Sequence, residues 1–278
     1  MLADLAAMFQ LRTILVAALI LVPLERVFAL HREQKVLRRS WRNDVFYQVF
    51  NRWPIGLAML ALAGGVTAAT AVVPSTLRET VAGSPLAIQL VCLPIVADVG
   101  FYAAHRLFHA VPWLWQFHAV HHSVEDMDWL AAARIHFVDL ALTKTLSILP
   151  VSMLGFGVEA LSIHAVIYTW QTYVEHGNVR LKLGPLRWLI ASPEFHHWHH
   201  AAEREARDKN FAGQLPFLDL LFGSAYMPKG LMPAAYGIDD RVPTNYLAQL
   251  LYPFVRIARM MLGRATTPAL GEATASQR

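Results

Sequence analysis

Residues 53–77 contain no charged side chain and are long enough to cross a lipid bilayer, which takes about 20 apolar residues. The Gly64-Gly65 pair and the many alanines of this stretch favour close helix packing in lipid. Hydrophobic residues make up 55% of the 278 residues and charged residues only 16%, whereas soluble domains have roughly 45–50% and 25%. The composition therefore predicts a membrane protein.

Three further apolar stretches predict additional membrane helices. Residues 11–30 precede a basic cluster and lack a clear small-residue cleavage site, so we expect a retained helix rather than a signal peptide. Residues 80–97 form the next span, and residues 137–174 form a helical hairpin that turns near Gly155 and Gly157. We predict an all-α, polytopic membrane protein with four to five membrane helices and a cytosolic histidine-rich helical cap.

The distribution of lysine and arginine predicts how the chain is oriented. The loop at residues 32–42 is strongly basic and should be cytoplasmic, whereas the loop at residues 74–84 carries one arginine and one glutamate. With alternating spans, residues 106–134 and 176–209 return to the cytoplasmic side. A re-entrant hairpin in place of two full spans would give the same result.

Charge and cysteine content exclude several classes of protein. The single cysteine, Cys92, lies inside an apolar run, which excludes an intramolecular disulfide, a cysteine-based zinc finger and an iron–sulfur cluster. The net charge is +4, and the basic residues gather beside apolar runs, which suits anionic lipid headgroups better than nucleic acid. We expect no nucleic-acid partner.

Ten of the thirteen histidines fall into spaced groups, and they are His105, His109, His118, His121, His122, His136, His176, His196, His199 and His200. Imidazole binds iron, zinc and copper well, and a four-coordinate zinc would use fewer than half of these rings. Rings three or four residues apart share one face of a helix, and each His-x2-His-His triplet adds a neighbouring ring for a second ion. The pattern predicts a site for two metal ions.

Sequence motifs around these histidines run from residue 98 to residue 224. They are Asp98-x3-Tyr102-x2-His105-Arg106-x2-His109, His121-His122-Ser123, Trp129, Arg134-x-His136, His176-Gly177-Asn178-Val179-Arg180-Leu181, Pro193-Glu194-Phe195-His196, Asn210-Phe211 and Leu221-Phe222-Gly223-Ser224. In this order they resemble the fatty acid hydroxylase / sterol desaturase superfamily of membrane di-iron enzymes. The resemblance implies that the two triplets and the 105/109 pair bind two iron ions, with His176 and His136 completing the ligand set.

A further set of side chains is expected around the ligands, namely Asp98, Tyr102, Arg134, Asn178, Asp208 and Asn210. Asp98 either orients a ligand imidazole or forms a salt bridge with a basic residue such as Arg106. Asp208 and Asn210 either support ligands or cap a loop. His136 has the alternative role of a hydrogen-bond donor beside the ligands.

Three histidines fall outside the predicted metal site. His31 is expected at the membrane interface, and His164 is expected to be a packing residue in an apolar helix. His197 stands between ligands and is expected to turn outward.

Three segments follow from these patterns. Residues 1–84 hold N-terminal membrane helices, and residues 85–225 hold the fatty acid hydroxylase-like catalytic domain. Residues 226–278 contain an amphipathic helix at residues 246–262, which we expect on the membrane surface, and a disordered tail from Thr266.

The family activity implied by the resemblance is oxygen-dependent hydroxylation or desaturation of a lipid, fatty acyl chain or sterol-like substrate. Two iron ions and dioxygen are the expected cofactor and co-substrate. No fused haem-binding domain is evident, so a separate ferredoxin-, flavin- or cytochrome-type electron donor is expected. The alternatives are a membrane zinc metallohydrolase, which the lack of a His-Glu-x2-His motif disfavours, and a non-enzymatic metal-binding membrane protein.

Overall fold

The computed structural model describes residues 2–51, 53, 56 and 70–263. Most of the predicted span at residues 53–77, and the predicted disordered tail, lie outside the described residues. Within the described part, the chain is all helical, and its only extended pairings are two isolated bridges. The all-α prediction is confirmed for these residues.

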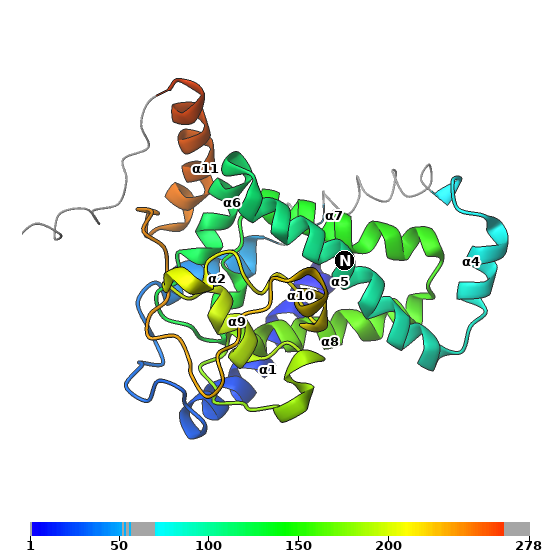
Figure 1. Cartoon of the computed structure of the whole chain (residues 1–278), viewed down its shortest axis with the longest axis horizontal. Coiled ribbons are helices and arrows are strands. Elements are labelled where there is room, and N and C mark those ends of the chain that lie inside the picture. Colours follow the sequence, from blue (N-terminus) through cyan, green and yellow to red (C-terminus); the bar gives the residue numbers. More distant parts are fainter. Residues whose placement is uncertain (1, 52, 54–55, 57–69, 264–278) are drawn as a thin grey trace, which may run out of the picture.

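Three long helices form the body of the molecule, and they are α5 (Leu86–Ala110), α7 (Phe137–Leu154) and α8 (Val158–His176). Figure 1 shows them running side by side, and α5 contacts both of the others. The hairpin between α7 and α8 turns at Gly155, whose φ of 83° is a left-handed conformation that glycine adopts without strain. The predicted division of residues 137–174 into two helices that turn at Gly155 is confirmed.

A close backbone contact fixes α5 against α7. A Cβ atom on Gly100 would collide with the backbone carbonyl of Leu146, so only glycine lets the two helices approach this far. The hydroxyl of Ser147 donates a 2.8 Å hydrogen bond to the carbonyl of Ala97 at the same crossing. Both helices are long and apolar enough to cross a membrane, as expected of a membrane protein.

The remaining helices are α1 (Leu2–Val27), α2 (Trp41–Phe50), α4 (Ser75–Ala82), α6 (Pro112–His122), η1 (Trp129–Ala133), η2 (Gly184–Trp188), α9 (Pro193–His199), η3 (Arg204–Ala206), α10 (Phe217–Phe222) and α11 (Tyr246–Met261). Helices α2, α6, α9 and α11 gather at the end of the long helices opposite α4 and form the cap (Figure 1). Proline occupies the first turn of α6 and α9, where its missing N–H costs no hydrogen bond. The cap therefore holds both histidine triplets.

Candidate metal centre

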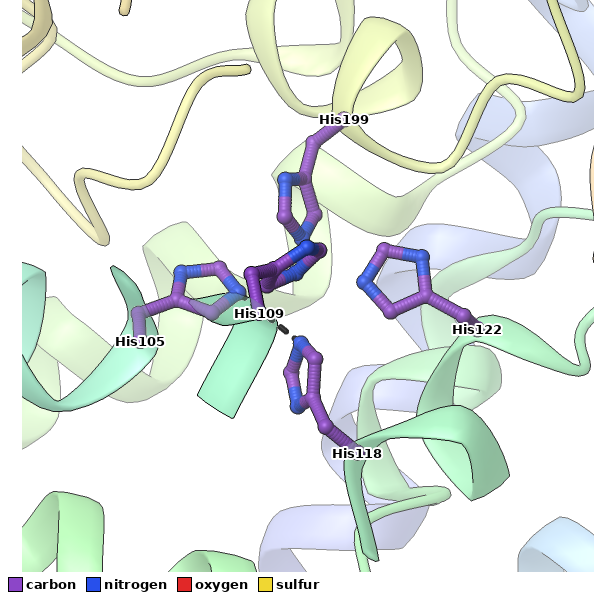
Figure 2. A group of neighbouring side chains, drawn as sticks. All are labelled: His105, His109, His118, His122 and His199. Carbon is purple, nitrogen blue, oxygen red and sulfur yellow. Dashed lines mark hydrogen bonds between the residues drawn. The ribbon is translucent and has the colours of Figure 1, made fainter. Parts of the chain in front are cut away.

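Nine histidines meet in two adjacent groups. Group 1 consists of His105, His109, His118, His122 and His199, and group 2 consists of His121, His176, His196 and His200. Within each group, one potential ligand atom per ring lies within 4.8 Å of all the others. Figure 2 shows the five rings of group 1 converging on one point from different helices.

Each triplet contributes to both groups. From α6, His118 and His122 enter group 1 while His121 enters group 2. At the end of α9 the assignment is reversed, because His199 enters group 1 while the two outer rings of that triplet enter group 2. Successive residues on a helix are about 100° apart, so neighbouring histidines must face different groups.

Four of the five rings in group 1 are held through Nδ1. His105 donates to the carbonyl of Phe211 (2.8 Å), His109 to Asp208 (3.0 Å), His118 to Asp139 (2.7 Å) and His199 to the carbonyl of Lys209 (2.8 Å). A neutral imidazole that donates from Nδ1 keeps a bare lone pair on Nε2. All four Nε2 atoms are therefore available as metal ligands.

Among the described residues, the Nε2 atoms of group 1 have no hydrogen-bond donor to accept from. Those of His109, His122 and His199 are buried and have no hydrogen-bond partner among the described residues. Those of His105 and His118 face each other at 2.9 Å. Two lone pairs at this distance repel each other unless both bind the same cation, so the donor set fits a metal ion.

Group 2 contains four rings, two of which are held through Nδ1. His121 donates from Nδ1 to the carbonyl of Arg134 (3.1 Å), and His176 donates to the carbonyl of Thr172 (2.8 Å). The Nε2 atoms of the four rings then form a circuit whose sides are 2.9, 3.1, 3.1 and 3.4 Å. Adjacent nitrogen ligands on one ion, each bonded at about 2.1 Å, are separated by about 3.0–3.4 Å, which matches this circuit.

Burial keeps the imidazoles neutral and able to bind metal. It lowers the pKa of His121 to about 4. Burial, reinforced by neighbouring rings, also lowers the pKa values of His118, His122, His196, His199 and His200 well below the usual value of 6.5. At neutral pH these rings carry lone pairs instead of extra protons.

Asp98 takes neither of its predicted roles. Its carboxylate accepts hydrogen bonds from the backbone N–H groups of Gly213 (2.8 Å), Gln214 (3.1 Å) and Leu215 (2.7 Å). The same loop carries the Phe211 carbonyl that holds His105. Asp98 therefore helps to position His105 through the backbone, and neither touches an imidazole nor pairs with a basic residue.

Tyr102 and Asn210 hold the same loop. The hydroxyl of Tyr102 lies 2.7 Å from that of Ser224 and accepts a hydrogen bond from Arg106 (3.2 Å). Asn210 has a left-handed φ of 59° and donates from its amide to the carbonyls of Phe195 and Tyr226. Asparagine tolerates this conformation better than most residues, so its role here is to shape the loop.

Arg134 and Asn178 hold the segments next to group 2. The guanidinium of Arg134 forms an ion pair with the buried Asp44, and the backbone carbonyl of Arg134 accepts the hydrogen bond from His121. Asn178 donates from its side chain to the carbonyl of His31 (3.0 Å) and accepts from the backbone N–H of that residue (2.8 Å). These contacts tie the chain after α1 to the segment that follows His176.

His136 joins neither group. It precedes α7 and accepts the backbone N–H of Val138 at Nδ1 (3.2 Å), while Nε2 donates to the carbonyl of Leu250 on α11 (3.1 Å). Both ring nitrogens are used in this way, so the geometry gives no support to His136 as a ligand. It caps α7 and contacts α11. The position next to the Arg134 motif, which suggested a metal ligand, is also the N-cap position of α7.

The three histidines expected outside the site are indeed absent from both groups. His164 is buried and contacts the side chain of Gln214 (2.7 Å), as a packing residue would. His31 is half-buried and contacts the hydroxyl of Tyr236 (2.9 Å). His197 was expected to turn outward, but it is fully buried and contacts the same hydroxyl at 2.9 Å, because the short helix α9 is buried on nearly all sides.

Asp139 is the residue that the sequence interpretation missed. It lies on the apolar helix α7 and orients His118. The available signal was a carboxylate inside an apolar run, which in membrane proteins marks a functional position by default.

A cavity of about 450 Å³ lies next to group 1. Its lining includes His109, His122 and His199, together with Asp208 and Trp115. The Trp115 ring lies 5.1 Å from that of His109 and 5.3 Å from that of His122. A small molecule can therefore approach group 1 through the cap.

Comparison with known proteins agrees with this geometry. Residues 90–224 match the family model of the fatty acid hydroxylases, and this segment contains all nine converging histidines. This segment belongs to the fatty acid hydroxylase superfamily. No solved structure matches the chain significantly.

Curated relatives include proteins named as hydroxylases and monooxygenases. An ornithine lipid hydroxylase from Rhizobium tropici is 33% identical over 63% of this chain and 53% of its own length. The alkylglycerol monooxygenase of Homo sapiens is 31% identical over 46% of this chain and 28% of its own length. A fatty acid hydroxylase from Lecanicillium is 29% identical over 67% of this chain and 50% of its own length. The chain thus spans about half or less of the curated relatives that it matches.

Proposed function

We propose that this fatty acid hydroxylase-superfamily protein is an oxygen-dependent membrane oxidoreductase that hydroxylates or desaturates a C–H bond of a lipid. The observation that carries the proposal is the convergence of nine imidazoles in two groups, with one ring nitrogen of each within 4.8 Å of the others in its group. In group 2 the Nε2 atoms have the spacing of ligands on one ion. A zinc hydrolase needs one ion with about three protein ligands, so it would leave most of these rings unused.

We propose one iron ion in each group, held by the five rings of group 1 and the four rings of group 2. When bound, iron would supply the reductive activation of dioxygen that attack on an unactivated C–H bond requires. The imidazoles provide neutral nitrogen donors, which suit Fe(II).

The chain's own residues would bind the metal ions, orient the imidazole rings and shield the site from water. Asp139 and Asp208 fix the ring orientation of His118 and His109 by accepting Nδ1–H, which directs Nε2 into the site. Backbone carbonyls do the same for four other rings. All but one of the nine imidazoles belong to buried residues, which limits water around the ligands.

For the substrate, we propose a lipid that enters from the bilayer, as the names of the relatives suggest. We further propose four to five membrane helices, with the metal centre on the cytoplasmic side and a separate electron donor. The basic loop at residues 32–42 supports this orientation. Residues 85–225 would form the catalytic domain, and α11 would lie against the membrane surface.

Metal analysis of the purified chain tests the proposal. We expect about two iron ions per chain, and oxygen consumption when a reductant and a lipid extract are added. His121→Ala and His199→Ala should lose iron and product, since they remove one ligand from each group. His164→Ala is the matched control, because His164 is a buried histidine outside both groups. Zinc alone without redox turnover, or full activity in both ligand variants, would contradict the proposal.

A further inference from the structure

A lysine lies inside the apolar helix α7. Lys144 lines a cavity of about 390 Å³ whose walls come from α1, α2, η1, α7 and α8 and the residues next to η1. The lining is rich in polar side chains for a space of this kind, and includes Gln48, Asn51, Thr169 and Tyr173. An apolar lipid chain alone could not form hydrogen bonds with these groups.

Lys144 has no anionic partner in the part of the chain that the structure describes. No described carboxylate lies within ion-pair distance of its Nζ atom, and no hydrogen bond reaches it. Its Nζ atom lies over the face of Tyr168, 3.9 Å from the ring centroid. A cation among apolar helices is costly without a counter-charge, and the ring offers only part of one.

A hydroxyl-bearing side chain lines the same cavity. Tyr173 accepts a 2.8 Å hydrogen bond from the side-chain amide of Gln48, and no acceptor for its own proton is found among the described residues. Such a hydroxyl can donate to an acceptor oxygen. An ammonium and a phenol hydroxyl in one cavity are complementary to an anionic oxygen.

The cavity backs onto group 2. Thr172 lines it, and the carbonyl of Thr172 accepts the hydrogen bond from His176. Ile135 also lines it and directly follows Arg134, whose carbonyl holds His121. Along α8, Tyr168 precedes His176 by eight residues, or about 12 Å.

We infer that this cavity binds the anionic end of an amphiphile, a carboxylate or a phosphate, with Lys144 as its counter-ion. The identification of this amphiphile with the substrate rests on the proposed function. The anionic binding itself does not, because it follows from the cation, the hydroxyl and the cavity. The competing interpretation is a hydrated lysine without a ligand.

Competition binding tests the inference. The probe is radiolabelled palmitate bound to the full chain in neutral detergent, with unlabelled palmitate, hexadecyl phosphate and hexadecanol as competitors. We expect at least one anionic competitor to be about tenfold or more stronger than the alcohol, as a charge-assisted hydrogen bond predicts. The more potent of the two anions identifies the headgroup chemistry.

Three variants complete the test. Lys144→Met should abolish the preference for anions, and Lys144→Arg should retain it. Lys35→Met removes one exposed positive charge elsewhere and should leave the preference unchanged. A preference that survives in Lys144→Met, or wild-type protein that binds the alcohol as tightly as the anions, overturns the inference in favour of a hydrated lysine.

Iron content separates this inference from the proposed function. Lys144→Met should keep the wild-type iron content, since Lys144 belongs to neither histidine group. Anion-selective binding in a protein that holds no iron and forms no product would refute the proposed function and leave the binding site standing. Iron-dependent turnover without anion selectivity would refute the anion-binding site and leave the proposed function standing.

Discussion

The Nδ1 atom of His118 lies 2.7 Å from a carboxylate oxygen of Asp139, and this contact joins the cap helix α6 to the long helix α7. Both side chains are buried, so water cannot replace either partner. The contact fixes which nitrogen of His118 carries the proton and directs the other toward His105.

Asp139→Asn should weaken metal binding without removing a ligand. An amide accepts this hydrogen bond less strongly than a carboxylate, and loss of such a support typically costs about 10–100-fold in metal affinity. Iron content after a graded chelator challenge measures the effect. Asp126→Asn, at a carboxylate outside both groups, is the control; equal iron retention in the two variants would contradict the assigned role of Asp139.

His136→Ala should retain the full iron content. Its two nitrogens contact backbone groups of α7 and α11, so its loss should cost about 1–3 kcal/mol of folding free energy through unsatisfied polar groups. Iron analysis alongside thermal unfolding separates the two effects. Iron loss as large as in His121→Ala would restore His136 to the ligand set.

Gly100→Val should be strongly destabilising. The added side chain would meet the backbone of α7 at Leu146, and overpacking of this kind costs about 1–3 kcal/mol or more. The melting temperature in detergent should fall accordingly. Ala103→Val, on an exposed face of α5, is the matched control and should melt near the wild type; a normal melting temperature for Gly100→Val would mean that the helices are further apart.

Acidification should destabilise the protein. Burial lowers the pKa of His121 to about 4, and lowers those of several other cap histidines well below 6.5. Below pH 6.5 the unfolded chain therefore binds more protons than the native chain, and each such histidine costs about 1.4 kcal/mol per pH unit. Stability is present at pH 7 and is lost as the pH falls toward 4. Melting temperatures between pH 7.5 and 5 test this, and a rise on acidification would contradict it.

The sequence predicts which histidines converge because their spacing along each helix is a local property. Nine of the ten predicted rings converge, and the C-terminal helix predicted at residues 246–262 is observed as Tyr246–Met261. His136 differs because its role depends on α11, more than 100 residues away in the chain. No local pattern reports such a contact.

The supporting residues could be predicted only in part. Asp98 and Asn210 lie close to the histidine motifs in the sequence, as predicted. Their partners, however, are backbone groups, and residue spacing does not predict the path of the loops that carry them. Asp139 was missed because it lies in an apolar run that reads as a plain membrane helix. The network around the ligands is set by tertiary packing, which explains these differences.

The reversed use of the two triplets has a consequence for how metal would be lost. Helix α6 gives two rings to group 1 and one to group 2, whereas the α9 triplet gives one and two. Unfolding of either helix would therefore strip ligands from both ions at once. We expect a chelator to empty the protein in a single cooperative step, with few molecules that hold only one ion. The two ions would share a common lifetime in the protein even though no ring belongs to both.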